Sequence, residues 1–350
     1  MKKYYTRACN FYFGEKSKKL VSQNKTLPLN GNNQISFDQI EIITRNSKKI
    51  IKIKNIQKLS GILRKKINKD LKNIIKKKNN FSKLNFKKIP NLMGILNMTP
   101  DSFSDGGQFN KKDKGFKHAI KLFRQGADII DIGGESTRPG SKTVSVKKEW
   151  NRIEKTLSKI NKKIPLSLDT QKAVIMEKGI KKGINLINDI SGLNYDSQTL
   201  KILQKYKIPF VIHHIKGIPA TMQKKPHYKN VLLDIYDYFE QKIKLVKSKG
   251  IKHNNIVIDP GIGFGKNLKH NMSIISNISI FHSLGFPILL GLSRKKFIKD
   301  ISEKNDTEKR LGGTISSSIY AMMQGVQILR VHDINELMQS IKVFKQLMKN

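Results

Sequence analysis

The chain has few of the residues that stabilise exported or zinc-structured proteins. Its 350 residues include one cysteine, Cys9, which excludes an internal disulfide and a zinc site built from cysteine pairs. No apolar run reaches the roughly 18 residues that cross a bilayer, and the N-terminus lacks the apolar core of an export signal. We therefore expect a cytoplasmic protein without membrane contacts.

Acidic residues are also scarce. The chain has 26 Asp and Glu against 68 Lys and Arg, which gives a net charge of +42. Such a charge is typical of proteins that bind nucleic acid or anionic membranes. Lys, Asn and Ile are abundant together, however, and all three have A/T-rich codons, so a biased genome is the simpler explanation and we expect no nucleic-acid partner. Because 38% of the residues are hydrophobic, we expect a packed core.

The first quarter of the chain is the most basic part. Residues 1–90 hold 24 Lys and Arg and 4 Asp and Glu, a net of +20 that leaves +22 for the other 260 residues. Residues 35–45 and 50–56 alternate apolar and polar side chains around a turn-like segment, which predicts a β-hairpin. Residues 76–88 resemble a linker. We therefore predict a basic N-terminal extension at residues 1–88.

An amphipathic helix is predicted between this hairpin and the linker. Its apolar residues recur at steps of three and four: Leu59, Ile62, Leu63, Ile67, Leu71, Ile74 and Ile75. Docking of this stripe on the main domain, with the lysines in solvent, is favoured over the alternatives, which are contact with a membrane surface or with RNA.

Residues 89–350 have the pattern of an α/β domain. Eight continuous apolar runs are each followed by polar or glycine-rich residues and a longer amphipathic stretch; the runs are 92–98, 127–132, 165–168, 186–190, 210–212, 256–258, 288–292 and 326–331. Continuous runs indicate strands covered on both faces, and eight βα repeats match the size of a (β/α)8 TIM barrel. An open doubly wound sheet is the alternative, disfavoured because no Gly-x-Gly-x-x-Gly turn follows the first run.

The polar residues at or just after the ends of these runs predict one shared site, because the carboxyl ends of barrel strands face a common mouth. They are Asn97, Asp131, Glu135, Asp169, Asn188, Asp189, His213, His214, Asp259, Ser293, Arg294, Lys295, Arg330 and His332. Any one of them could be a helix cap or a turn former, but together they indicate function.

The members of this ring are of two chemical types. Asp169, Asn188 and Asp259 follow buried strands and need hydrogen-bond donors, which a flat heterocycle with adjacent N–H groups would supply; pairing with Lys295 and backbone amides is the alternative. The cationic or cation-capable side chains are Arg138, Lys295, Arg330 and His332, and they predict an anionic, phosphorylated ligand.

Three loops are also informative. Residues 97–107 and 133–141 are rich in Gly, Pro, Ser, Thr and Asp, so they could fold over a ligand and exclude water, or could be ordinary turns. The segment 259–266, DPGIGFGK, resembles a phosphate-binding loop but lacks Ser or Thr after its lysine. Its glycines are better explained by a close approach of the backbone to a flat ligand.

Residues 91–338 resemble dihydropteroate synthase, a transferase of the folate pathway. The segments that carry the resemblance are LNMTPDSFSDGG, DIIDIGGESTRPGS, LSLDT, INDISG, IDPGIGFGK, GLSRKKFI and ILRVHDI, in the family's order. The resemblance implies condensation of a 7,8-dihydropterin-6-ylmethyl diphosphate with 4-aminobenzoate, which gives dihydropteroate and diphosphate. It also implies Mg²⁺ as cofactor and a homodimer.

The resemblance assigns roles to residues by position. It implies that Asp169, Asn188, Asp259 and Lys295 hold the pterin edge, with Arg330 packed against the ring. Asn97, Arg138, Arg330 and His332 match the diphosphate and magnesium site, with Asn97 as the metal ligand. Thr137, Arg138, Phe103, Pro139 and Ser293 match the aminobenzoate pocket, and Asp101 matches a loop residue that organises the closed site. The implied catalytic residues are Asp101, Arg138, Asp169 and Lys295.

Two other functions are compatible with parts of this pattern. A related pterin-binding barrel transfers a methyl group to a corrinoid, which needs a cobalamin partner for which this sequence has no domain. The chain could also be a nucleic-acid-binding protein on an inactive barrel, with the basic extension as its binding surface. The complete ring of acidic and basic residues argues against an inactive barrel.

Overall fold

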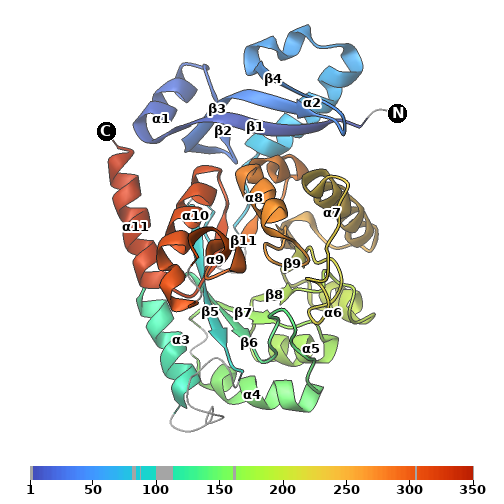
Figure 1. The fold of residues 1–350 in the computed structure, drawn as a ribbon, viewed down its shortest axis with the longest axis vertical. Helices are drawn as coiled ribbons and strands as arrows, with labels where there is room; N and C mark the ends of the chain where they lie inside the picture. The colour runs from blue at the N-terminus through green and yellow to red at the C-terminus, as the bar shows by residue number, and fades with distance from the viewer. Residues whose placement is uncertain are drawn as a thin grey trace.

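The computed structural model describes residues 3–80, 84–86, 88–99, 113–160, 163–303 and 306–349. These residues form a parallel eight-stranded barrel surrounded by helices, with a smaller antiparallel sheet packed at one end (Figure 1). No helix within these ranges is both long enough and apolar enough to span a bilayer.

The barrel strands coincide with the eight predicted apolar runs. They are β5 (Asn91–Asn97), β6 (Ile129–Gly133), β7 (Leu166–Asp169), β8 (Leu186–Asp189), β9 (Phe210–His213), β10 (Ile256–Asp259), β11 (Leu289–Gly291) and β12 (Ile328–Val331). Their order is β10-β9-β8-β7-β6-β5-β12-β11, and a single parallel bridge between Ile258 and Ile288 joins the two ends. The barrel is therefore nearly closed, and the open doubly wound alternative is wrong.

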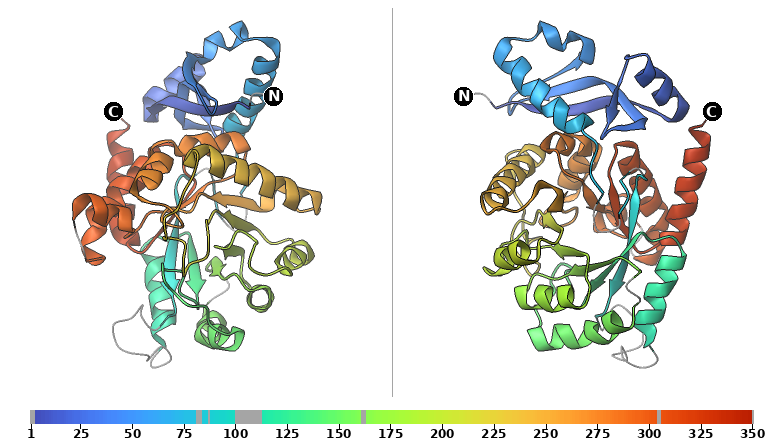
Figure 2. Two further views of the ribbon diagram at one scale, coloured as in Figure 1. Left: turned by 45° about the vertical axis from the view of Figure 1, so that its right-hand side comes forward. Right: turned by 180° about the vertical axis from the view of Figure 1, so that it is seen from behind.

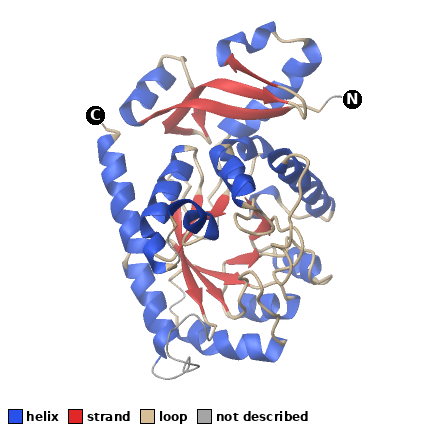
Figure 3. Cartoon of the chain, viewed as in Figure 1, coloured by secondary structure: helices blue, strands red, loops and turns tan. Residues whose placement is uncertain are grey.

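Helices cover the outside of this barrel (Figure 3). They are α3 (Lys114–Arg124), α4 (Val146–Lys159), α5 (Ala173–Lys181), α6 (Thr199–Tyr206), α7 (Val231–Ser248), α8 (Leu268–Ser276), α9 (Lys296–Ser302), α10 (Leu311–Met323) and α11 (Ile334–Leu347), with 3₁₀ segments η4 (His253–Asn255), η5 (Ile278–Leu284) and η6 (Glu308–Arg310). The strands are buried on both faces, as their continuous apolar composition predicts; every residue of β10 is buried.

The amino end of the barrel is filled by residues that the sequence had indicated as a linker. Leu84 and Phe86 are buried in one cluster with Met93, Val211 and Val257, which lie near the beginnings of their strands. The linker interpretation of this segment is therefore wrong, because its apolar side chains close the barrel at the end opposite the mouth.

The N-terminal extension is larger than the predicted hairpin and helix. It contains β1 (Tyr5–Phe13), α1 (Gly14–Ser22), β2 (Leu27–Leu29), β3 (Asn32–Ile43), β4 (Lys48–Lys52), η1 (Ile53–Lys58) and α2 (Gly61–Ile75). The hairpin is present as β3 and β4, but β3 also pairs with β1 and β2. Sequence reasoning missed β1, α1 and β2, and it extended the second hairpin strand into η1.

The apolar stripe of α2 packs mainly on the extension's own sheet. Ile67, Leu71 and Ile74 form one cluster with residues that include Phe37 and Ile40. Ile62, which belongs to the predicted stripe, is 82% exposed. The helix also lies against η5 of the barrel, so the predicted docking on the main domain holds for part of α2, while the apolar stripe packs on a sheet that the sequence did not indicate. The helix still meets the barrel through Asn73, whose Nδ2 donates to the carbonyl of Ser283 at 2.8 Å.

Polar and aromatic contacts fix the extension to α7 and η5. The Tyr5 ring is buried edge-on against Tyr236 with centroids 5.1 Å apart, and its hydroxyl donates to Asp237 at 2.9 Å. Arg45 binds both Asp234 and Asp237. Because η5 leads into β11, these contacts lie toward the amino ends of the strands, and both views of Figure 2 place the extension at that end of the barrel.

Candidate functional site

Buried polar side chains gather where the barrel strands end. Asp169 is the last residue of β7, Asn188 lies beside it in β8, and Asp131 lies in β6 on the other side. All three are buried. Parallel pairing in this register is what brings these residues together from positions far apart in the sequence.

Arg330 of β12 joins these side chains across the barrel. Its Nε donates to Asp131 Oδ2 at 2.6 Å and its Nη2 donates to Asp169 Oδ2 at 2.9 Å. Asn188 Nδ2 donates to the same oxygen of Asp131 at 3.0 Å. The planar guanidinium is thereby held in a fixed orientation, which a lysine could not reproduce. Sequence reasoning placed Asp131 on the rim but assigned it no role with Arg330.

Several acceptors in this cluster have no partner among the described residues. They are Asp131 Oδ1, Asp169 Oδ1 and Asn188 Oδ1, all buried. Burial raises the pKa of Asp169, and the charge of Arg330 opposes that rise. Because buried acceptors without donors are costly, this arrangement is suited to a ligand that presents several N–H groups.

Asp259 and Lys295 lie on the other side of the mouth. Asp259 Oδ1 accepts from the Gly261 amide at 2.7 Å, and burial raises the pKa of Asp259 to about 6, with that amide and Lys295 opposing the rise. Burial lowers the pKa of Lys295 to about 8, an effect that Arg330 increases and Asp259 opposes. Within the described chain no ion pair joins Asp259 to Lys295, so both remain available to a ligand; Lys295 Nζ lies 4.3 Å from the Phe264 ring centroid.

The loop after β10 is fastened to the end of β9. Gly261 has φ +68°, and a Cβ there would lie 2.0 Å from the His214 carbonyl oxygen, so the turn requires glycine. The buried Nζ of Lys266 lies 2.9 Å from His214 Nδ1 and donates to the Phe264 carbonyl at 2.9 Å. The glycine-rich segment thus makes a close approach to protein backbone, and Lys266 serves as an internal tie.

Ser293 and His332 form a second polar pair at the mouth. The Ser293 hydroxyl and His332 Nδ1 are 3.0 Å apart. Burial, together with the charges of Arg330, Arg294 and Arg138, lowers the pKa of His332 to about 3. The imidazole is therefore neutral at neutral pH until a ligand brings negative charge. The adjacent Arg294 is bound to Asp333.

The remaining predicted residues lie outside these clusters. Thr137 is half-buried and Arg138 and Pro139 are exposed, in the loop after β6, and the structure gives their side chains no hydrogen bond to the clusters. Asn97 is half-buried at the end of β5. Asp101 and Phe103 lie outside the described residues.

A buried ion-pair network supports the loops after β6 and β7. Lys172 pairs with Glu135 and with Glu149, the latter at 2.6 Å. Thr170 Oγ1 donates to Glu149 at 2.6 Å, and Gln171 Nε2 donates to Glu135 at 2.9 Å. Glu135, which the sequence suggested as a ring member, is thus satisfied by protein groups. The sequence pattern did not indicate its partner Lys172, because Lys172 lies three residues beyond the end of β7.

Comparisons with known proteins show the family of this chain. Residues 93–332 match the model of a family described as pterin binding enzyme. Dihydropteroate synthase of Escherichia coli strain K12 is 40% identical over 256 residues, which are 73% of this chain and 90% of that protein. The Clostridium beijerinckii enzyme is 41% identical over 255 residues, 72% of this chain and 92% of the relative.

Solved structures of similar proteins show the same architecture. Dihydropteroate synthase of Yersinia pestis with a sulfonamide drug complex has a TM-score of 0.72 and 37% identity, covering 76% of this chain and 97% of that one. The Xanthomonas albilineans enzyme in complex with 7,8-dihydropteroate has a TM-score of 0.69 and 30% identity, covering 76% of this chain and 96% of the other.

Proposed function

This chain belongs to the dihydropteroate synthase family of pterin-binding enzymes, and from that premise we propose how its barrel mouth joins a dihydropterin-6-ylmethyl diphosphate to 4-aminobenzoate. The enzyme is a transferase of folate biosynthesis. The observation that carries the detailed proposal is the set of buried acceptors without partners beside the fixed guanidinium of Arg330.

The pterin is bound through its N–H edge. Asp169 Oδ1 and Asn188 Oδ1 are buried acceptors that need donors, and Asp259 contributes its carboxylate from the opposite side. Lys295 supplies a donor for an acceptor atom of the ring. The guanidinium of Arg330, whose Nε and Nη2 are engaged by carboxylates, offers a face on which the flat bicycle stacks.

The diphosphate is held by cationic and hydroxyl groups near β11, β12 and the loop after β6. Arg330, His332 and Ser293 lie at the mouth, and Arg138 is near enough for its charge to lower the pKa of His332. Negative charge from the diphosphate raises the pKa of His332, so the imidazole becomes a better donor when the substrate is present. Thr137, Pro139 and Phe103 are assigned to the 4-aminobenzoate pocket together with Arg138 and Ser293.

The residues at the mouth fit a Mg²⁺ that is shared with the substrate. Within the described ranges, no three His, Cys, Asp or Glu side chains come together as a metal cluster. Mg²⁺ favours oxygen ligands and is commonly bound by one or two protein groups plus phosphates and water. The amide oxygen of Asn97, half-buried at the end of β5, is a ligand of this kind. When bound, Mg²⁺ supplies positive charge that stabilises the departing diphosphate.

The reaction needs no protein nucleophile. The bond between the pterin methylene carbon and the diphosphate oxygen breaks, and its electron pair leaves with the diphosphate. The aminobenzoate nitrogen donates its lone pair to the same carbon, forming the C–N bond, and then releases a proton to solvent. Arg330 and His332 stabilise the leaving charge, while the pterin ring, held by Asp169 and Asp259, delocalises the developing positive charge. The mouth of the barrel positions the two substrates beside each other. Asp101 and the loop 133–141 exclude competing water.

Two further features belong to this proposal. The functional unit is a homodimer, as the sequence resemblance implies. Residues 1–88 act as a supporting extension and residues 89–350 as the catalytic domain.

One assay tests the proposed reaction. Purified protein is given the pterin diphosphate, and diphosphate release is measured with and without 4-aminobenzoate and with and without Mg²⁺. Release that requires both additions supports the proposal. Absence of release with authentic substrates would reject it, and methyl transfer from a methylated folate to a corrinoid would instead identify the related methyltransferase. Tight, salt-sensitive RNA binding without turnover would favour the inactive-barrel alternative.

A further inference from the structure

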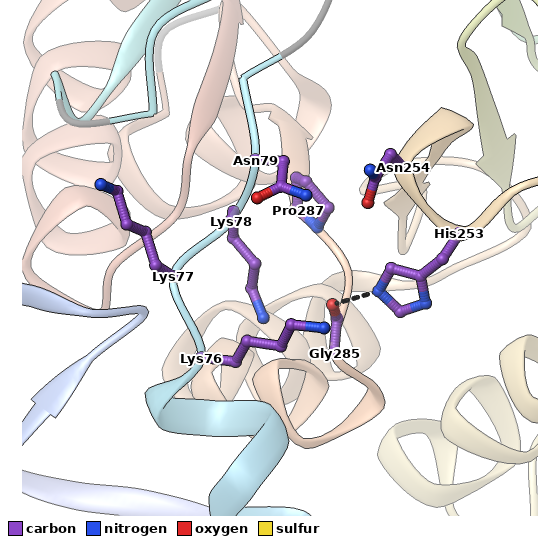
Figure 4. A pocket seen from close by; sticks show the side chains of 8 residues that line it. All are labelled: Lys76, Lys77, Lys78, Asn79, His253, Asn254, Gly285 and Pro287. Carbon is purple, nitrogen blue, oxygen red and sulfur yellow. Dashed lines mark hydrogen bonds between the residues drawn. The ribbon is translucent and has the colours of Figure 1, made fainter.

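A cation-rich hollow lies where the extension joins the amino end of the barrel. It opens to solvent. Its described lining residues are Lys76, Lys77, Lys78, Asn79, His253, Asn254, Gly285 and Pro287 (Figure 4). His253 and Asn254 precede β10, and Pro287 precedes β11, so this hollow is at the opposite end of the barrel from the catalytic mouth.

Lys78 is the central observation. Lys78 is only 5% exposed, yet among the described residues its Nζ donates only to a backbone carbonyl, that of Asn73, at 2.9 Å. No acidic side chain is among the described lining residues. Burial, together with the charge of Lys76, lowers the pKa of Lys78 to about 7. A buried ammonium without a counter-charge is costly, so an external anion would supply what the protein lacks.

His253 faces Lys78 across the hollow. Its ring stacks on Phe286 with centroids 4.2 Å apart, and its Nε2 lies 3.2 Å from the Gly285 carbonyl oxygen. Burial lowers its pKa, and the charges of Lys247, Lys76 and Lys78 lower it further. In Figure 4 the ammonium groups of Lys76 and Lys78 approach Gly285 from the extension side while Lys77 points away. The contacts with Phe286 and Gly285 therefore hold the imidazole in place beside Lys76 and Lys78.

We propose that this hollow binds a phosphate-class oxyanion, either inorganic phosphate or diphosphate, between Lys76, Lys78 and His253. Such an anion would contact the extension on one side and the loops before β10 and β11 on the other. It would therefore strengthen the attachment of the extension to the barrel. The site is separate from the mouth, so it is independent of the proposed catalytic mechanism.

The test compares two charge reversals, one within helix α2 and one at the residue immediately after it. Lys76→Glu puts a carboxylate in the hollow, whereas Lys65→Glu makes the same charge change at an exposed position of α2 that does not line it. All proteins also carry Arg138→Ala, a change at an exposed residue, to weaken phosphate binding at the mouth. Inorganic phosphate and diphosphate are titrated separately by calorimetry at constant ionic strength, and Lys78→Met provides a second variant whose apolar side chain suits a buried position.

The expected result is a loss of affinity of about tenfold or more in Lys76→Glu and in Lys78→Met, because each removes a charge-assisted hydrogen bond, with little change in Lys65→Glu. Binding near pH 7.5 should also take up protons, since the anion raises the pKa values of Lys78 and His253. Whichever of the two anions binds more tightly identifies the ligand. Equal loss in Lys65→Glu and Lys76→Glu, or no binding of either anion, would overturn the proposal.

Discussion

Arg330 and Asp169 are joined by a hydrogen bond of 2.9 Å although their strands, β12 and β7, are not neighbours in the barrel. The guanidinium thus spans the mouth, and Asp131 holds its Nε at 2.6 Å. Two directional contacts fix the plane of the cation, which leaves its face, rather than its edge, for a flat ligand. Orientation is therefore as important as charge at this position.

Replacing Arg330 by lysine tests the importance of orientation. Lysine keeps the charge but cannot bind Asp131 and Asp169 with two coplanar N–H groups, so we expect kcat/KM to fall by about tenfold to a hundredfold. Diphosphate release at saturating 4-aminobenzoate measures this. Arg64→Lys, the same change on the extension helix, should leave kcat/KM unchanged. A near-normal rate for Arg330→Lys would contradict the role assigned to the guanidinium.

The pH profile of kcat/KM for the pterin diphosphate should be bell-shaped. Binding needs ionised Asp259 and protonated Lys295, whose pKa values burial moves to about 6 and about 8. Activity should therefore fall below about pH 6 and above about pH 8. Lys295→Arg should shift the alkaline limb upward, because arginine stays protonated. A profile whose alkaline limb is the same in both proteins would exclude Lys295 as its source.

The barrel was predictable from the sequence because its signal is local and repeated. Each buried strand reads as a continuous apolar run, and each run ends in a polar residue such as Asp169 or Asp259. Topology then brings those ends together, so their proximity follows once the barrel is assumed.

The extension was less predictable because its main contacts are not local. β1 pairs with β3 over more than twenty intervening residues, and no short pattern in residues 5–13 indicates that pairing. The pairing of Lys172 with Glu135 and Glu149 likewise depends on three-dimensional placement. The pairing of Asp131 with Arg330 becomes evident only in the folded barrel. Individual strand ends were therefore identified without the contacts that orient them.

Lys172→Met should destabilise the protein strongly. It would leave the carboxylates of Glu135 and Glu149 buried without their cation, a change that typically costs about 3–5 kcal/mol. Urea unfolding measures it, with Lys181→Met as an exposed control. Adding Glu135→Gln and Glu149→Gln to Lys172→Met should recover part of the loss. If the triple variant is no more stable than the single one, uncompensated charge is not the cause.

Removal of the Tyr5 side chain should loosen the extension without affecting turnover. Tyr5→Ala loses the edge-on contact with Tyr236 and the hydrogen bond to Asp237, with an expected loss of about 3–5 kcal/mol. Tyr5→Phe keeps the ring and should lose only about 1 kcal/mol. Because these contacts are toward the amino end of the barrel, kcat should stay within about twofold for both variants where they are folded. A large fall in kcat for folded Tyr5→Phe would show coupling to the mouth.

Asp259→Asn should make the protein more stable and less active. Burial raises the pKa of Asp259 from 3.8 to about 6, so the folded state binds this proton more tightly than the unfolded state. The ionised carboxylate therefore destabilises the fold above pH 6, by about 3 kcal/mol at about 1.4 kcal/mol per unit, and this penalty shrinks as the pH falls from 6 to 4.

The neutral amide avoids that penalty while its oxygen can still accept from the Gly261 amide. Asp259→Asn should thus exceed the wild type in unfolding free energy at pH 7.5, and the gap should narrow at pH 5. The surface change Asp300→Asn should stay within about 0.5 kcal/mol at both pH values. Affinity for the pterin should nevertheless fall at pH 7.5, since the amide presents one acceptor oxygen where the carboxylate presents two. A variant less stable than the wild type at pH 7.5 would mean that the charge of Lys295 already compensates the buried carboxylate.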